Sequence, residues 1–211
     1  MHIAVRATQQ QKDELKNKNF DSNVTIHWLA ENETPQQKTD AFFDLTFNDA
    51  NVDANDFTND VIVFANAVNS TCKEINKKNY VRINAWPGFI NRTIIEVACI
   101  NEQYKQQAEK ILTALNWKFI WTPDDYGFIA ARIIAMIINE AYYALEENVS
   151  TKEQIDVAMK LGTNYPYGPF EWSEKIGIEK IYFLLEKLSA QNKRYTIAGS
   201  LTEADQKSKN L

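Results

Sequence analysis

Short hydrophobic runs alternate with polar segments along the first half of the chain. Residues 24–29 (VTIHWL) largely alternate between apolar and polar positions, as a half-buried strand does. The continuous run at residues 61–65 (VIVFA) is typical of a buried strand in a parallel sheet. Strands are predicted at residues 1–8, 24–29, 41–47, 61–65, 80–85 and 117–121, and the run at 94–98 (IIEVA) is apolar around one carboxylate.

The polar segments between these runs carry helix signals. Residues 9–18 favour a helix, residues 70–77 predict a short one, and residues 101–116 predict an amphipathic helix. The apolar face of this last helix consists of Tyr104, Ala108, Ile111, Leu112 and Leu115. Strands that alternate with helices indicate an α/β layer with a mostly parallel sheet, which we place at residues 1–122.

The second half of the chain begins with an unusually apolar helix pattern. Residues 128–145 are apolar on almost every side, which indicates a central helix buried by neighbouring helices. Arg132, Asn139 and Glu140 interrupt the run, so it is too short and too charged to span a bilayer. Its apolar surface exceeds what a small helical domain covers, so we expect a homodimer in which a second subunit supplies further helices.

The remaining helix signals define the predicted domain organisation. A helix is predicted at residues 151–161, and one or two more within residues 170–191. These helices and the central one form a predicted all-α domain at residues 123–198. The chain from Arg194 onward has the polar composition of an extended tail, which we expect to be flexible over residues 199–211.

Charge and cysteine usage narrow the possible partners. The net charge is −5 at pH 7, and the absence of a basic stripe argues against a nucleic-acid partner. The N-terminus has no basic segment followed by an apolar stretch, so we expect a cytoplasmic protein that contacts no membrane. Cys72 and Cys99 lack close partner spacing and a neighbouring histidine cluster, which favours two reduced thiols over a disulfide or a metal site.

Several motifs in the second half occur in a specific order. They are Gly127-Phe128, Arg132, Asn139-Glu140-Ala141, the segment Ile155 to Gly162 (IDVAMKLG) and the segment Pro166 to Glu171 (PYGPFE). In order and spacing they resemble the C-terminal domain of the 3-hydroxyacyl-CoA dehydrogenase family. The resemblance implies a truncated, degenerate Rossmann-like α/β domain followed by an all-α dimerisation domain, within an oxidoreductase family of fatty-acid metabolism that uses NAD.

The first half lacks the cofactor motif that this resemblance implies. The family has Gly-x-Gly-x-x-Gly after its first strand, because a backbone without side chains must approach the pyrophosphate closely. Here the place is taken by Arg6-Ala7-Thr8-Gln9-Gln10-Gln11, and no glycine precedes Gly88. Glu31, after the second predicted strand, could hold a ribose, although acidic residues are common after strands. We therefore predict that no cofactor is bound.

The catalytic pair of the family is also incomplete. The family uses a histidine that moves the proton of the substrate hydroxyl and a glutamate that orients it. The glutamate matches Glu96, whereas the histidine matches Asn84, or Ile83 if the alignment slips by one residue. The only histidines, His2 and His27, belong to the first two predicted strands. An asparagine cannot exchange a proton near neutral pH, so the acid/base role has no carrier.

Two more family positions have changed, and others remain open to two interpretations. A substrate-positioning serine matches Val68, and an asparagine matches Ala131. Glu96 is either a surviving catalytic acid and ligand contact or a structural carboxylate hydrogen-bonded to Arg92 or Asn84; we expect a partner, since burying it unpaired is costly.

Substrate contacts are predicted at Asn84 and Arg132. Arg132 and Lys175 could meet phosphate groups or form ion pairs with Glu140 and Glu174. Asp124-Asp125 is expected to complement the dipole of the central helix rather than to bind metal. The aromatic residues are expected in the core or dimer interface rather than in an acyl pocket; they are Trp117, Trp121, Tyr126, Tyr142, Tyr143, Tyr165, Tyr167 and Trp172.

Three functions remain compatible with the sequence. The first is a member of this family that has lost dehydrogenase activity and serves as a binding or interaction protein. The second is an active NAD(P)-dependent 3-hydroxyacyl-CoA dehydrogenase with altered site residues. The third is a protein that binds a small molecule of the acyl-CoA type without redox chemistry.

Overall fold

The computed structural model describes residues 1–18, 20, 23–30, 33–35, 39–52 and 61–210. The chain forms two compact units, Met1–Phe128 and Ile129–Leu211. The first contains the predicted α/β layer and the second contains the predicted helices, whereas the sequence placed the boundary at residues 122 and 123. Glu31, the predicted ribose contact, lies outside the described residues.

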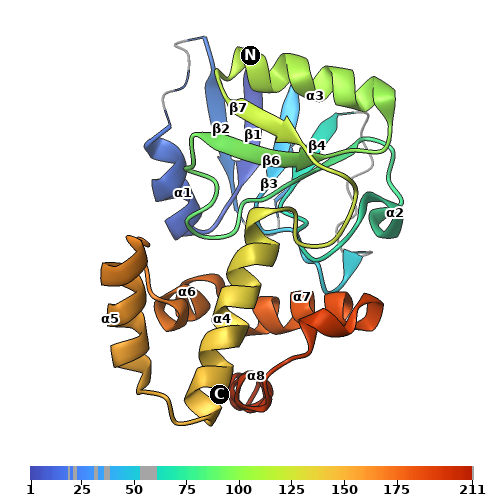
Figure 1. Ribbon diagram of the computed structural model, residues 1–211. Coiled ribbons are helices and arrows are strands. Elements are labelled where there is room, and N and C mark those ends of the chain that lie inside the picture. Colours follow the sequence, from blue (N-terminus) through green and yellow to red (C-terminus); the bar gives the residue numbers. More distant parts are fainter. Residues whose placement is uncertain (19, 21–22, 31–32, 36–38, 53–60, 211) are drawn as a thin grey trace. The chain divides into compact units, whose positions relative to one another are not determined.

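A seven-stranded sheet forms the centre of the first unit (Figure 1). Its strand order is β2-β1-β3-β4-β5-β6-β7, and neighbouring strands are parallel except for β5 and β6. The strands are β1 His2–Arg6, β2 Thr25–Leu29, β3 Ala41–Asp44, β4 Ile62–Ala65, β5 Tyr80–Ile83, β6 Ile94–Ala98 and β7 Lys118–Trp121. The predicted mostly parallel α/β sheet is confirmed.

Alternating side chains of the central strands build a core on each face of this sheet. Phe43 and Phe64 stack on one face with ring centroids 4.5 Å apart, and Phe42 lies on the other. The first face also holds Ala108 and Leu112 of helix α3 (Glu102–Ala114), two residues of the predicted apolar stripe. The unit has two shorter helices, α1 (Gln9–Lys16) and α2 (Cys72–Ile75).

The second unit is all helical, as predicted. Its helices are α4 Ala130–Glu146, α5 Lys152–Thr163, α6 Pro169–Ile176, α7 Ile178–Gln191 and α8 Gly199–Ser208, with a 3-10 turn at Lys193–Tyr195. The central helix α4 packs against α6, α7 and α8 (Figure 1). Among the described residues, no helix combines the length and the apolar character that crossing a membrane requires.

The motifs of the second unit build a corner between α5 and α6. Both carboxylate oxygens of Asp156 accept hydrogen bonds at the start of α6, from the N–H groups of Phe170 at 2.8 Å and Glu171 at 3.1 Å. Gly168 lies against this carboxyl, and a Cβ atom there would be 2.3 Å from its Cγ. Glu171 accepts from the N–H of Gly168 and pairs with Lys160. The motif therefore fixes one helix start, because a carboxylate satisfies N–H groups that lack partners there.

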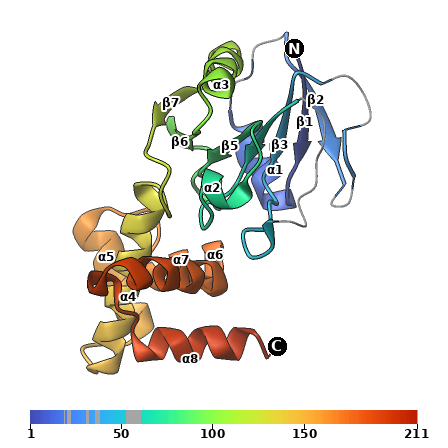
Figure 2. The ribbon, with the colours of Figure 1, turned by 90° about the vertical axis from the view of Figure 1, so that its right-hand side faces the viewer.

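The predicted flexible tail is wrong, because residues 199–208 form helix α8. Figure 2 shows α8 running beside α7, against which it packs. Asn139 of α4 donates to the carbonyl of Thr196 at 2.9 Å and accepts from the N–H of Ala198 at 3.0 Å. Leu201 is fully buried. The polar composition was misleading, because few buried contacts suffice to order a short helix that packs on two others.

Asp124 and Asp125 do not lie at the start of the central helix, contrary to the prediction. Gly127 and Phe128 have positive φ angles of 78° and 49°, so the backbone turns there and α4 begins at Ala130. The first turn of α4 contains no acidic residue. Asp124 instead pairs with Arg82, at 2.8 Å between Oδ1 and Nη1.

Candidate functional site

The carboxyl ends of β1 and β3 mark the place where a doubly wound sheet offers a ligand crevice. The chain passes from β1 to β2 on one side and then to β3 on the other, and ligands of such folds bind where the order reverses. Arg6 and Asp44 are register partners at these two strand ends. Two hydrogen bonds join them, Nε to Oδ1 at 3.1 Å and Nη2 to Oδ2 at 2.5 Å. The Arg6–Asp44 ion pair therefore connects the ends of β1 and β3, at the place where a ligand would bind in such a fold.

Side chains at the start of α1 form hydrogen bonds with the backbone N–H groups there. The Thr8 hydroxyl accepts from the N–H of Gln11 at 3.3 Å, and Oε1 of Gln11 accepts from the N–H of Thr8 at 3.0 Å. Nε2 of Gln11 donates to the carbonyls of Leu45 at 2.9 Å and Ala85 at 3.2 Å. The Gln11 side chain is thus buried between the loops that follow β1, β3 and β5.

These contacts decide whether a dinucleotide fits. A pyrophosphate at a helix start needs free N–H groups and a backbone without side chains around it. Thr8 and Gln11 bond to each other, and Gln11 occupies volume that the glycines of the motif leave open. The residues present at this helix start therefore do not fit NAD.

Asn84 and Glu96 meet on β5 and β6. Nδ2 of Asn84 donates to Oε2 of Glu96 at 2.8 Å, and the N–H of Asn84 donates to the carbonyl of Glu96 at 3.1 Å. Both residues are buried. Of the two partners that the sequence left open for Glu96, Arg92 and Asn84, the structure shows this hydrogen bond from Asn84. The amide nitrogen of Asn84 thus points to Glu96, and Oδ1 of Asn84 is buried without a hydrogen bond.

Two polar residues beside this pair were missed by sequence reasoning. Asn66, directly after β4, accepts from the N–H of Ala85 at 2.9 Å and donates to the carbonyl of Leu45 at 3.1 Å. Glu14 of α1 accepts from the N–H of Gly88 at 2.8 Å. The position of Asn66 at a strand end was a usable signal. Together with Gln11, these side chains hold the loops in place by neutral or backbone-directed bonds, which move no proton.

The sequence did not predict that Arg82 is buried and bound to several groups at once. The Arg82 side chain is fully buried, and its guanidinium donates to Asp124, to the carbonyl of Ala67 at 2.9 Å and to the carbonyl of Asp125 at 3.0 Å. The guanidinium also lies over the Phe128 ring, 4.6 Å from its centroid. Arg82 therefore fastens the last residues of the first unit to its sheet.

The other predicted positions are distributed over the two units. His2 and His27 stack on β1 and β2, with centroids 5.8 Å apart. Val68 is buried in the loop after β4, and Ala131 is buried in α4. Arg132 belongs to the second unit, where its guanidinium lies 5.9 Å from the Tyr195 ring centroid.

The aromatic residues of the predicted pocket are divided between the two units. Lys175 lies over the Tyr167 ring at 5.1 Å. Trp117 belongs to the core of the first unit, whereas Tyr142 and Trp172 are buried in the second. In the part of the chain that the structure describes, no group of three or more His, Cys, Asp or Glu side chains could hold a metal ion.

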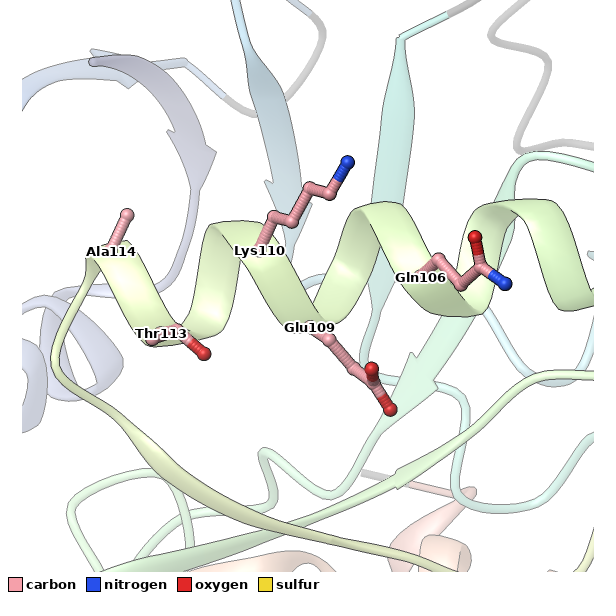
Figure 3. Close-up of a pocket in the computed structure, with 5 residues that line it drawn as sticks. All are labelled: Gln106, Glu109, Lys110, Thr113 and Ala114. Atoms are coloured by element: carbon pink, nitrogen blue, oxygen red, sulfur yellow. The ribbon is translucent and has the colours of Figure 1, made fainter.

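The surface of α3 has a depression of about 540 Å³ that carries no site. Figure 3 shows its five lining residues, which all come from this one helix and do not converge on a common point: Gln106, Glu109, Lys110, Thr113 and Ala114. Oε1 of Glu109 is already bonded to the indole N–H of Trp121 at 2.7 Å. Figure 3 shows the Glu109 and Lys110 side chains pointing to different sides of the helix, so the ionisable groups of the lining do not meet.

Comparison with known proteins shows which protein family the second unit resembles. The family model of the 3-hydroxyacyl-CoA dehydrogenase C-terminal domain matches residues 127–209. The chain is 51% identical over 65 residues to 3-hydroxyadipyl-CoA dehydrogenase of Escherichia coli (strain K12), covering 30% of the chain and 14% of the relative. It is 39% identical over 83 residues to 3-hydroxybutyryl-CoA dehydrogenase of Bradyrhizobium diazoefficiens, covering 39% of the chain and 28% of the relative.

The fold likeness extends over nearly the whole chain. The crystal structure of FadB2 of M. tuberculosis matches with a TM-score of 0.72 and 12% identity, covering 98% of this chain and 93% of that one. At this identity the match shows the fold, a Rossmann-like unit followed by a helical one. The chain spans less than a third of the length of the two curated relatives. Residues 127–209 are therefore similar to the C-terminal domain of the 3-hydroxyacyl-CoA dehydrogenase family.

Proposed function

We propose that the chain is a family member without dehydrogenase activity, which acts by binding rather than by hydride transfer. One observation carries this proposal: Gln11 and the Arg6–Asp44 pair occupy the start of α1 and the ends of β1 and β3. A dinucleotide would have to displace a buried amide together with its bonds to Leu45 and Ala85. Leaving buried carbonyl groups without partners is costly.

The Asn84–Glu96 pair supports the same conclusion from the side of proton transfer. The hydroxyl oxidation in this family needs a group that accepts and returns a proton near neutral pH. The amide of Asn84 cannot do this, and Glu96 is bound to that amide. Glu96 therefore has a structural role in this proposal, joining β5 to β6.

A homodimer through the second unit is the partner that we propose. Helix α5 buries only Asp156 among its residues, while Val157 and Leu161 are 50% and 84% exposed. These two residues are four positions apart and therefore share one helix face. A second copy of the same helix face would remove this apolar surface from water, as a two-fold interface does.

Binding of an acyl-CoA without redox chemistry is the second candidate. It rests on the match of residues 127–209 to the 3-hydroxyacyl-CoA dehydrogenase C-terminal domain and on the 51% identity over 65 residues to 3-hydroxyadipyl-CoA dehydrogenase. Calorimetry with acetyl-CoA and acetoacetyl-CoA tests it, with coenzyme A as the matched control for the nucleotide part. Heat from the acyl forms alone would support an acyl-CoA binder, and no heat from any of them would exclude one.

Turnover of acetoacetyl-CoA with NADH or NADPH tests the main proposal. No absorbance change at 340 nm is expected above the rate without protein. Turnover by the unchanged protein would contradict this proposal. If that turnover is lost in Glu96→Gln and kept in Glu109→Gln, the alternative, an active dehydrogenase of fatty-acid metabolism, would be supported. Glu109 is a suitable control because it is a glutamate of the same unit whose carboxyl bonds to Trp121 and not to Asn84.

A further inference from the structure

The strand β2 forms one outer edge of the sheet, beside β1. A doubly wound fold is built from two halves of three parallel strands each, and the third strand of the first half lies outside the second. Here the chain passes from β2 to β3, which pairs with β1 on its other side. Among the residues that the structure describes, no strand therefore occupies the position outside β2.

The pairing of β2 with β1 shows which backbone groups lie on this edge. The N–H of Thr25 donates to the carbonyl of Met1 at 2.8 Å, so the backbone groups of Thr25 face β1. Successive residues of a strand direct these groups to alternate sides, so Ile26 and Trp28 direct theirs outward. The N–H of Ala30, next in this series, is already bonded to Oε2 of Glu33 at 3.1 Å. The edge therefore offers the N–H and C=O groups of Ile26 and Trp28 to an added strand.

The sequence of β2 lacks the residues that commonly keep a sheet edge from pairing. Such edges often carry a lysine or a proline, or consist of a very short strand. β2 reads TIHWL and contains neither residue, while threonine, isoleucine and tryptophan favour strands. β7, at the opposite edge, is one residue shorter and begins with the exposed Lys118. Of the two edges, β2 is therefore the one that is open to pairing.

A hollow of about 480 Å³ lies beside this edge. It is lined by Ile26–Leu29 of β2 together with Ala4, Glu33, Pro35 and Thr39. Ala4 and Leu29 belong to the core on one face of the sheet, and His27 lies on the same face because it is the register partner of Ala4. A strand added outside β2 would direct every second side chain to this face. The hollow is therefore a place where side chains of an added strand would leave water.

The charges around the edge indicate which side chains fit. Glu33 is exposed and lines the hollow, and no lysine or arginine is among its described lining residues. A carboxylate in this position favours a partner with a basic side chain. On the other face of the sheet Trp28 is 37% exposed, and Lys12 of α1 lies 5.7 Å from the centroid of its ring. The hollow is thus the apolar and acidic side of the edge.

We propose that the β2 edge binds an extended peptide segment of a partner protein, which adds to the sheet as the strand outside β2. The backbone of this segment bonds to Ile26 and Trp28, its alternate apolar side chains enter the hollow, and a basic side chain pairs with Glu33. Because only two residues of β2 offer backbone groups, the interface is small, as in transient complexes. Binding at this edge requires neither NAD nor Glu96, so its failure and the failure of the proposed function are separate results.

Amide hydrogen exchange of the protein alone tests whether the edge is open. The amides of Ile26 and Trp28 are expected to exchange at least about tenfold faster than those of His27 and Leu29, because bonds to β1 protect only the latter pair. This measurement needs no variant to fold. Equal protection of all four amides would show that the edge is already covered, which would overturn the proposal.

Selection from a random peptide library supplies the probe for binding. Enriched peptides are expected to alternate apolar with other residues, to carry a lysine or arginine, and to protect the Ile26 and Trp28 amides when bound. Trp28→Pro removes one edge donor at a position where a strand tolerates proline, so affinity should fall about tenfold. Trp28→Phe keeps this donor and should bind like the unchanged protein. Glu33→Gln should lose the preference for basic peptides.

Two further results would overturn the proposal. One is a selection that enriches no peptide, or only peptides that bind Trp28→Pro and Trp28→Phe equally well. The other comes from sedimentation of the protein alone: self-association that is lost in Trp28→Pro and kept in Trp28→Phe would assign the edge to a second copy of the chain instead of a partner peptide.

Discussion

At the scale of single residues, glycine and carboxylate positions carry most of the information in the helical motifs. Gly168 is required because the carboxyl of Asp156 occupies the space of its missing side chain. Gly162, in the same motif region, has no neighbour within 4 Å of an added Cβ. Two glycines of one family pattern therefore differ completely in what they contribute to stability.

Gly168→Ala is expected to destabilise the protein by about 2–3 kcal/mol, because the new methyl group forces Asp156 away from the start of α6. Gly162→Ala is the matched control and should be stabilising by roughly 0.5–1 kcal/mol, since alanine is the better helix former. Urea unfolding followed by circular dichroism measures both changes. Equal effects of the two substitutions would show that the close contact at Gly168 does not hold the corner.

Residue chemistry also sets the limit of what the sequence could predict for the site. The missing glycines could be recognised from the motif, and a burial argument predicted that Glu96 has a partner while leaving Arg92 and Asn84 open. The role of Gln11 was not predictable, because amide side chains follow no spacing rule and bind whichever carbonyl the fold brings near. For Asn66, the strand end was a signal for a polar role, but the sequence did not indicate its partners. The burial of Arg82 was not predictable for a different reason, because its partner Asp124 is distant in sequence.

At the scale of elements, strands and buried helices were predictable, whereas the last helix was not. The strands were recognised by continuous or alternating apolar runs, and α4 by an apolar pattern with no polar face. Helix α8 is largely polar and is ordered by contacts from elsewhere. Asn139 holds the segment before it, and the hydroxyl of Ser200 donates to the carbonyl of Tyr142 at 2.9 Å.

Asn139→Ala is expected to release this segment. It removes both bonds and leaves the carbonyl of Thr196 and the N–H of Ala198 without these partners, at about 1–3 kcal/mol for each group that stays buried. Limited proteolysis should then cut the chain between residues 192 and 200 faster than in the unchanged protein. Glu140→Ala, a change at the exposed neighbouring position, is the control and should leave the cutting rate unchanged. Unaltered cutting in Asn139→Ala would show that packing alone orders α8.

At the scale of the whole molecule, the two units differ in how many of the family's motif residues they contain. The helical unit retains the family's motifs in order, and its exposed apolar residues on α5 lead us to expect a dimer. The α/β unit retains the sheet but fills the crevice with its own side chains. On the proposed function, the fold persists although the residues that serve a cofactor are replaced, because strand packing and cofactor binding depend on different residues.

Leu161→Glu is expected to weaken the dimer, because it places a charge on the apolar face of α5. Light scattering coupled to gel filtration should show a shift from dimer toward monomer at micromolar concentration. Gln206→Glu on the exposed side of α8 adds the same charge and should leave the mass unchanged. A monomer in the unchanged protein would contradict the proposed interface.

The most direct test of the central claim is a titration of the purified protein with NADH, followed by energy transfer from its five tryptophans to the nicotinamide. The closed α1 start and the Arg6–Asp44 pair predict no saturable signal up to millimolar NADH. Saturable binding in the micromolar range would contradict the account, since it would show that Gln11 and Arg6 leave room for the dinucleotide after all.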